Sequence, residues 1–258
     1  MNTNNNNLPI DLLIRISLIK DLGFNLNGES VILDFGCGSG KKVKVLRDLG
    51  YQAFGCGTRF NTEHDVDTKS MMHDGIIREI NLNNYVLPFE DNKFDFIFSE
   101  SVFEHVQNYS ESIAELSRVL KPGGVCLHTF VSRYKPIEVH VKVPFASFIN
   151  SYWWLYFWAF LGCRNEWTDC QSVPDRATRY LNYLKEETNY LPKRDLLSYF
   201  LSGFENVAFC EKLYLKYSPG RRRYLYSLSK IFPFVAVFFS TFNQRVIATS
   251  KPIKSGSM

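Results

Sequence analysis

The sequence predicts an α/β protein with a doubly wound, largely parallel sheet. An apolar run, Val31–Leu33, leads into a turn with three glycines, and further strand-like and helix-like segments alternate up to Val131. Beyond that point the alternation is lost and aromatic residues become frequent. Alternating strands and helices indicate parallel strands with helices on both faces, so we expect the aromatic region to be an insertion after the fifth strand.

Length and composition favour a single domain. The 258 residues are 45% hydrophobic and 22% charged, as in ordinary globular proteins. The six cysteines form no C-x-x-C pair and show no Cys/His ligand spacing, so we expect no metal site and no disulfide framework. The first residues, MNTNNNN, lack the pattern of a signal peptide, and we expect a cytoplasmic, reduced protein.

The stretch Val31–Gly40, VILDFGCGSG, indicates a ligand-binding turn. Its spacing is G-x-G-x-G with an acid, Asp34, two residues before the first glycine. The dinucleotide fingerprint is G-x-G-x-x-G, and Lys41 stands where its third glycine would be. Glycine permits positive φ and a close approach of ligand to backbone. An ordinary strand-to-helix turn is the alternative for this stretch alone.

The flanking elements follow in order. Leucine and isoleucine at helical spacing predict a first helix, and Gly50 ends the helix that follows the glycine turn. The predicted segments are a helix over 8–22, a helix over 41–49, a strand over 51–55 and a short strand over 78–82.

Four further patterns follow residue 86. Leu87-Pro88-Phe89 precedes a turn, Phe94-Asp95 leads into an apolar strand at 96–98, and Glu104-His105 comes after it. Asn108 begins a capping-box pattern before a helix over 109–120. The stretch RVLKPGG then ends that helix and leads into a strand over 125–131.

Together these motifs make residues 30–131 resemble the class I S-adenosylmethionine (SAM) methyltransferases of the small-molecule, methyltransferase-11 type. The resemblance implies a Rossmann-like, seven-stranded sheet, SAM as cofactor and a methyltransferase activity. It implies a cofactor-binding core at 30–131, a substrate-facing insertion at 132–205 and C-terminal strands with a basic, aromatic excursion at 206–258. A strand over 204–215 and an antiparallel last strand over 244–250 would complete the sheet.

The resemblance also implies the cofactor-binding residues, with two departures. Gly57 stands where the family usually has an acid for the ribose, and Asn83 stands near the usual Asp beside the adenine amine. Asp65 or Asp67 could replace the ribose acid if their loop folds back. The implied residues are Asp34, Phe35, Gly36, Cys37, Gly38, Gly40, Gly57, Asn83, Ser99 and Glu100.

Three residues are candidates for catalysis. Glu138 and His140 lie two apart, so on an extended segment both side chains would point to one side. His140 could then take a proton from a substrate hydroxyl, with Glu138 orienting the imidazole. His105 is a second candidate base, although in the family this position more often lines the cofactor pocket. A surface histidine beside an acid is the alternative for His140.

Two apolar stretches, 152–161 and 231–242, are too short to span a bilayer. From Lys212 to Met258 there are nine Lys/Arg and no acid. Peripheral contact with the inner face of a membrane or a pocket for an amphiphilic substrate would explain both features. Core or dimer packing, and a solvated basic face, are the alternatives.

We therefore expect methyl transfer from SAM to a small-molecule, glycan or glycolipid acceptor, by O-methylation. The sequence of the insertion, with E-x-H followed by V-P-F, W-W and L-G-x-R-N, resembles methyltransferases of bacterial surface-polysaccharide assembly. A non-catalytic binding module is the alternative that Gly57 and Asn83 favour. A nucleic-acid methyltransferase is a third reading, and Ser99-Glu100-Ser101, where amino-methylating DNA enzymes have N/D-P-P-Y/F, disfavours it. We expect no nucleic-acid partner.

Overall fold

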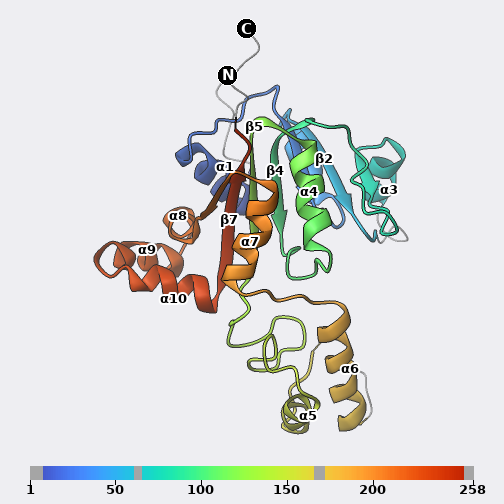
Figure 1. Cartoon of the computed structure of the whole chain (residues 1–258), viewed down its shortest axis with the longest axis vertical. Helices are drawn as coiled ribbons and strands as arrows, with labels where there is room; N and C mark the ends of the chain where they lie inside the picture. The colour runs from blue at the N-terminus through green and yellow to red at the C-terminus, as the bar shows by residue number, and fades with distance from the viewer. Residues whose placement is uncertain (1–7, 61–65, 166–171, 253–258) are drawn as a thin grey trace.

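The computed structural model describes residues 8–60, 66–165 and 172–252 and is built around one seven-stranded sheet (Figure 1). The strand order is β3-β2-β1-β4-β5-β7-β6, and β7 runs in the opposite direction to the other strands of the sheet. The strands are β1 (Val31–Phe35), β2 (Gln52–Gly57), β3 (Ile77–Glu79), β4 (Phe94–Glu100), β5 (Leu120–Val131), β6 (Asn206–Phe209) and β7 (Gln244–Ser250). This confirms the predicted doubly wound sheet with an antiparallel last strand.

Helices cover both faces of the sheet because the side chains of each central strand alternate between two apolar cores. In β1, Leu33 and Phe35 join the core under α4 and α7, whereas Ile32 joins the core under α1, α2 and α8. The bounds of these helices are α1 (Ile10–Asp21), α2 (Lys41–Asp48), α4 (Tyr109–Val119), α7 (Lys193–Gly203) and α8 (Glu211–Tyr217). Helix α3 (Val66–His73) lies beside the β3 edge (Figure 1).

The insertion between β5 and α7 has a small apolar core of its own. Helices α5 (Tyr152–Phe160) and α6 (Val173–Glu186) pack through Leu155, Ala159 and Tyr180, together with Val141 and Val143. Figure 1 shows this unit hanging from the end of the sheet at which β5 ends. The predicted aromatic, helical insertion is therefore confirmed, although α6 was not predicted.

Several predicted elements differ from the structure. Residues 204–215 were expected to form one strand, but β6 ends at Phe209 and helix α8 begins at Glu211, so that Tyr214 and Leu215 pack on the sheet face rather than extend its edge. The apolar stretch at 231–242 belongs to two helices, α9 (Arg221–Ile231) and α10 (Phe234–Phe242), which are interrupted near Pro233.

Among the described residues, no helix is long and apolar enough to cross a membrane.

Candidate active site

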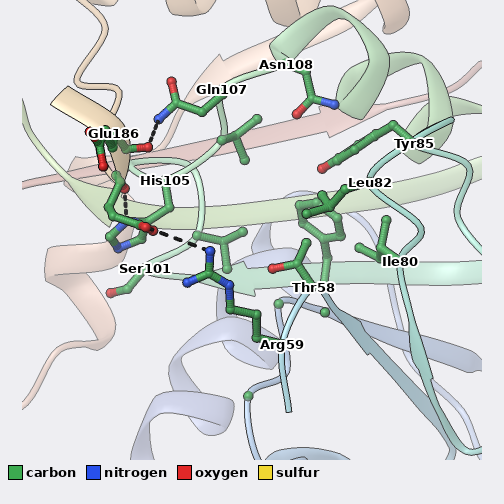
Figure 2. Close-up of a pocket in the computed structure, with 17 residues that line it drawn as sticks. Thr58, Arg59, Ile80, Leu82, Tyr85, Ser101, His105, Gln107, Asn108 and Glu186 are labelled. Atoms are coloured by element: carbon green, nitrogen blue, oxygen red, sulfur yellow. Dashed lines mark hydrogen bonds and ion pairs between the residues drawn. The ribbon is translucent and has the colours of Figure 1, made fainter. Parts of the chain in front are cut away.

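A cavity of about 450 Å³ opens at the carboxyl ends of β1, β2 and β4. In open α/β sheets this is the edge at which ligands bind. Figure 2 shows the apolar residues Ile80, Leu82 and Tyr85 at one end and His105 and Glu186 at the other. The rest of the lining comes from the glycine turn, the end of β2, the residues after β4 and the end of α6: Phe35, Gly36, Gly38, Gly57, Thr58, Arg59, Ser101, Val102, Val106, Gln107, Asn108 and Glu187.

The glycine turn forms the floor of this cavity at Gly38. The amides of Gly36 and Cys37 donate to the carbonyl oxygen of Cys56 at 2.8 and 3.0 Å, which ties the turn to β2. Gly38 has φ +53°, and a Cβ built there would meet no atom within 4 Å, so its missing side chain leaves open space in the cavity. Gly40 serves packing instead, because a Cβ there would lie 2.1 Å from Cδ1 of Ile77.

Six of the cofactor-binding residues predicted from the sequence do not line the cavity: Asp34, Cys37, Gly40, Asn83, Ser99 and Glu100. Asp34 is buried beneath the turn, where burial raises its pKa to about 7 against the opposing charges of Lys42 and Arg15. Glu100 forms ion pairs with Lys42 and Arg15.

Of the two positions that depart from the family pattern, Gly57 lies at the cavity and Asn83 does not. Gly57 lines the cavity, and a Cβ added there would lie 3.3 Å from Cζ of Phe60. Asn83 is exposed, and its amide donates to Oδ1 of Asn81 rather than facing the cavity. Asp67 does not replace the missing acid, because it lies in the first turn of α3 and pairs with Lys44. Asp65 lies outside the described residues.

Ser99 is fully buried, and its hydroxyl lies 2.8 Å from Nδ1 of His128 on β5. Burial lowers the pKa of His128 to about 3, so the imidazole stays neutral in the folded protein. In the unfolded chain it takes up a proton below pH ~6.5. Protonation of the unfolded state therefore lowers stability as the pH falls through this range.

We expect this titration to be measurable against His128→Leu. The free energy of unfolding of the wild type, relative to the variant, should be about 2 kcal/mol smaller at pH 5 than at pH 7. Urea unfolding of both proteins at the two pH values measures this difference, in which the titrations of all other groups cancel. An equal difference at both pH values would contradict a neutral, buried His128.

The insertion brings the three predicted catalytic residues together. His105, from the turn after β4, packs edge to face against the ring of His140, with 4.8 Å between ring centroids. His105 lines the cavity and His140 does not. Nδ1 of His105 lies 2.6 Å from the carbonyl oxygen of Glu187, which can only accept, so Nδ1 donates and Nε2 of the neutral ring keeps its lone pair.

His140 lies behind His105 and outside the cavity lining. Its ring contacts Tyr183 of α6, and its Nε2 is buried without a hydrogen-bond partner among the described residues. Burial lowers the pKa of His140, against the opposing attraction of the Glu138 carboxylate, whose Oε1 lies 4.0 Å from Nε2. The imidazole is therefore neutral near pH 7.

The prediction that Glu138 lies on an extended segment is wrong. Residues 138–141 form a tight turn that the buried Glu138 carboxylate closes: Oε2 accepts from the amides of His140 and Val141 at 2.7 and 2.6 Å. Its Oε1 accepts from the hydroxyl of Tyr190 at 2.6 Å. A carboxylate with this many local donors forms a turn more readily than a strand.

Glu138→Ala is expected to lower the free energy of unfolding by about 3 kcal/mol, because one buried and two part-buried donors lose their acceptor. Glu138→Gln should cost less than about 1 kcal/mol, because the amide oxygen can serve the two backbone donors and its NH₂ can donate to Tyr190. Urea unfolding of both variants tests this. Equal losses in the two would contradict a hydrogen-bonding role for Glu138.

Glu104 adds a second buried acid next to this turn. Its side-chain oxygens are buried and make no hydrogen bond within the described residues. Burial, reinforced by the neighbouring Glu138, raises its pKa to about 7, so the carboxyl is partly protonated near neutral pH.

The end of the insertion forms one wall of the cavity. The amide of Asn189 donates to the carbonyl oxygen of Glu104 at 2.6 Å, and its side chain donates to the carbonyl oxygen of Val106 at 2.9 Å. Arg59, from the loop after β2, lies 3.8 Å from the Glu187 carboxylate, as the dashed line in Figure 2 marks. No sequence signal predicted these contacts, since the residues lie more than 80 positions apart in the chain.

The capping box predicted at Asn108, before α4, does not form. The side chain of Asn108 makes no capping hydrogen bond to α4 and lines the cavity instead. Two further lining residues, Tyr85 and Ser101, have φ of +44° and +54°. Positive φ is strained for such residues and is concentrated at functional sites.

Strand order, antiparallel β7 and the glycine turn at the end of β1 are together those of the class I SAM-dependent methyltransferase fold. Residues 33–128 match the model of a family described as a methyltransferase domain. Over those residues the chain is similar to that domain.

Curated relatives match the same region. A demethylmenaquinone methyltransferase of Staphylococcus saprophyticus is 33% identical over 113 residues, which cover 41% of this chain and 47% of that protein. An uncharacterized protein of Methanocaldococcus jannaschii is 29% identical over 127 residues, covering 48% of this chain and 51% of that protein. The chain thus matches about half the length of these relatives.

Solved structures share the fold. A SAM-dependent methyltransferase from Mesorhizobium loti has a TM-score of 0.52 at 15% identity, covering 93% of this chain and 99% of that one. Phosphoethanolamine N-methyltransferase 2 of Haemonchus contortus in complex with SAM has a TM-score of 0.51 at 15% identity, covering 94% and 52%. At this identity the likeness concerns the fold alone.

Proposed function

We propose that this chain is a SAM-dependent methyltransferase that acts on a small-molecule acceptor. The observation that carries the proposal is the cavity at the ends of β1, β2 and β4, where Gly38 leaves open the space that a side chain would fill. The family match over 33–128 and the methyltransferase names of curated relatives support the same reaction.

The cavity lining fits SAM. When bound, the cofactor supplies a methyl group made electrophilic by a positively charged sulfur. We place its amino-acid portion beside Gly38, where the backbone can approach a ligand without meeting a Cβ. We place the adenine at the apolar end, against Ile80, Leu82 and Tyr85.

The ribose of SAM needs a hydrogen-bond partner other than the carboxylate that the family usually has at the position of Gly57. A side chain at Gly57 would press on Phe60, so this structure disfavours an acid there. Thr58 is the next residue and lines the cavity. Its hydroxyl can donate and accept one hydrogen bond each, and we propose it as the ribose contact.

For the proton of the acceptor we propose His105 as the general base. It lines the cavity, and its Nε2 carries the lone pair while Nδ1 is held by the Glu187 carbonyl. His140 and Glu138, the base and orienting acid expected from the sequence, become positioning residues that hold the His105 ring from behind. A neutral imidazole suits an acceptor hydroxyl, which must lose a proton during methylation.

The acceptor we propose is therefore a hydroxyl-bearing small molecule, with a glycan or glycolipid as the narrower form of the proposal. The insertion forms the polar wall of the cavity and so stands where an acceptor would enter. The described cysteines are all free thiols, which fits a reaction in the cytoplasm.

Calorimetric titration of SAM into the purified chain tests the proposal. We expect saturable binding in the micromolar range, followed by formation of S-adenosylhomocysteine when hydroxyl acceptors are screened. Absence of binding at millimolar SAM would overturn it.

The second candidate is a non-catalytic module that binds SAM without transferring its methyl group. The absence of an acid at Gly57 favours it. Tight SAM binding with no turnover on any screened acceptor, unchanged in a His105→Asn variant, would support this reading instead.

A further inference from the structure

Helices α9 and α10 expose a large apolar surface that the proposed reaction does not use. Figure 1 shows the two helices as a projection to one side of the sheet. Ile231 is 72% exposed and Phe234 66% exposed, at the junction between the helices. Monomeric proteins rarely expose contiguous apolar patches of this kind without a partner. The α9–α10 surface consists of Tyr224, Leu228, Ile231, Phe232, Phe234, Val237, Phe238 and Phe242.

The exposed side chains form a stripe along each helix. In α9 they are Tyr224, Leu228 and Ile231, spaced four and three residues apart and therefore on one face. In α10 the exposed Phe234 and Phe238 are likewise four apart, whereas Val235 and Phe239, one residue further along and so about 100° round the helix, pack inward.

The inward face anchors α10 to the rest of the protein. Phe239 is buried and stacks on the ring of Tyr214 in α8, with 6.5 Å between centroids. The exposed stripe is thus not needed to hold α10 in place.

Basic residues flank the α9 stripe. Arg221, Arg223 and Lys230 are exposed, and by helical spacing Arg221 lies on one side of the stripe and the other two on the opposite side. The sequence contains no acid from Lys212 onward. An apolar stripe between basic flanks is the pattern of helices that lie in the interface of an anionic membrane.

We propose that the α9–α10 surface docks on an anionic lipid bilayer. The apolar stripe would enter the headgroup boundary while the flanking cations meet acidic headgroups. Two copies of the surface facing each other would bring their arginines and lysines together with no acids to pair them, which argues against a second copy as occupant.

Helix α5 also exposes an apolar stripe, which can be compared with the α9–α10 surface. Trp153, Phe157 and Phe160 are exposed at helical spacing too, but α5 contains no charged residue. It lacks the complement to an anionic surface, so we assign the docking to α9–α10 alone.

Co-sedimentation of the full chain with vesicles tests the proposal. The vesicles contain phosphatidylcholine alone or with roughly 30 mol% phosphatidylglycerol, an anionic lipid. We expect binding to the anionic vesicles that weakens with salt, and little to phosphatidylcholine. Val237→Glu/Phe238→Glu should weaken binding by at least about tenfold, and Arg221→Gln/Arg223→Gln/Lys230→Gln by on the order of a hundredfold.

Trp153→Glu is the matched control, because Trp153 is 76% exposed on the other projecting helix. It should bind anionic vesicles as the wild type does. Thermal melts establish that each variant is folded, and SAM titration, which does not involve this surface, should be unchanged in all of them.

Four outcomes would overturn the proposal. These are equal binding to both vesicle types, wild-type binding by both α9–α10 variants, and loss of binding in Trp153→Glu. The fourth is a concentration-dependent dimer that Val237→Glu/Phe238→Glu dissociates, because it would make a second copy the occupant.

Discussion

Gly38→Val is expected to abolish SAM binding while leaving the fold intact. A Cβ at Gly38 would meet no protein atom within 4 Å, so the valine side chain enters the cavity rather than the core. It would occupy the space into which we place the cofactor. We expect affinity to fall more than about 100-fold, equivalent to about 3 kcal/mol, as measured by calorimetric titration.

Gly23→Val is the matched control. Gly23 also has positive φ, at +90°, and open space around its Cβ position, but it follows α1 and does not line the cavity. In both variants a side chain at positive φ costs roughly 1–2 kcal/mol of backbone strain. Gly23→Val should therefore lose similar stability and keep SAM affinity. Retained affinity in Gly38→Val would remove the cofactor from this cavity.

His105→Asn is expected to lower turnover by about 10²–10⁴-fold, the usual contribution of a general base. The asparagine amide can still donate to the Glu187 carbonyl, which Nδ1 of His105 contacts at 2.6 Å, so the loop and the insertion should stay in place. Steady-state formation of S-adenosylhomocysteine with an acceptor from the screen measures the effect. SAM affinity, measured separately, should change by less than about tenfold.

His140→Phe separates the two histidines. A phenyl ring can keep the packing against His105 and Tyr183, for which the centroid separations are 4.8 and 5.4 Å, but it carries no nitrogen. If His140 only positions His105, this variant should keep turnover within about tenfold of wild type. A larger loss in His140→Phe than in His105→Asn would assign the base to His140.

Local sequence patterns predicted the core of the fold well. Val31–Leu33 with its glycine turn, and the helical spacing of Ile113 and Leu116, each indicate an element on their own. Leu120, which was expected to belong to the helix, instead begins β5. The antiparallel β7 was predicted over the residues it occupies, Gln244–Ser250. Local patterns failed where an apolar run is compatible with both a strand and a helix. The segment 204–215 was predicted as one strand, but its first half pairs in the sheet as β6 and its second half packs on the sheet face as α8.

In the candidate site, too, local patterns predicted some of the residues and missed others. Gly36, Gly38 and Gly57 were predicted and line the cavity, because turns at strand ends leave a signal in consecutive residues. Thr58, Tyr85 and Asn108 line it as well and were missed or given another role.

The sequence by itself determined the class of this protein: a SAM-methyltransferase core whose strands, glycine turn and helix ends are specified by neighbouring residues. Only the tertiary structure decided which histidine faces the cavity. His105 and His140 meet through an insertion that Glu138 folds into a turn and that Asn189 and Glu187 attach to the core. These contacts join residues far apart in the chain, and no periodicity or spacing in the sequence records them.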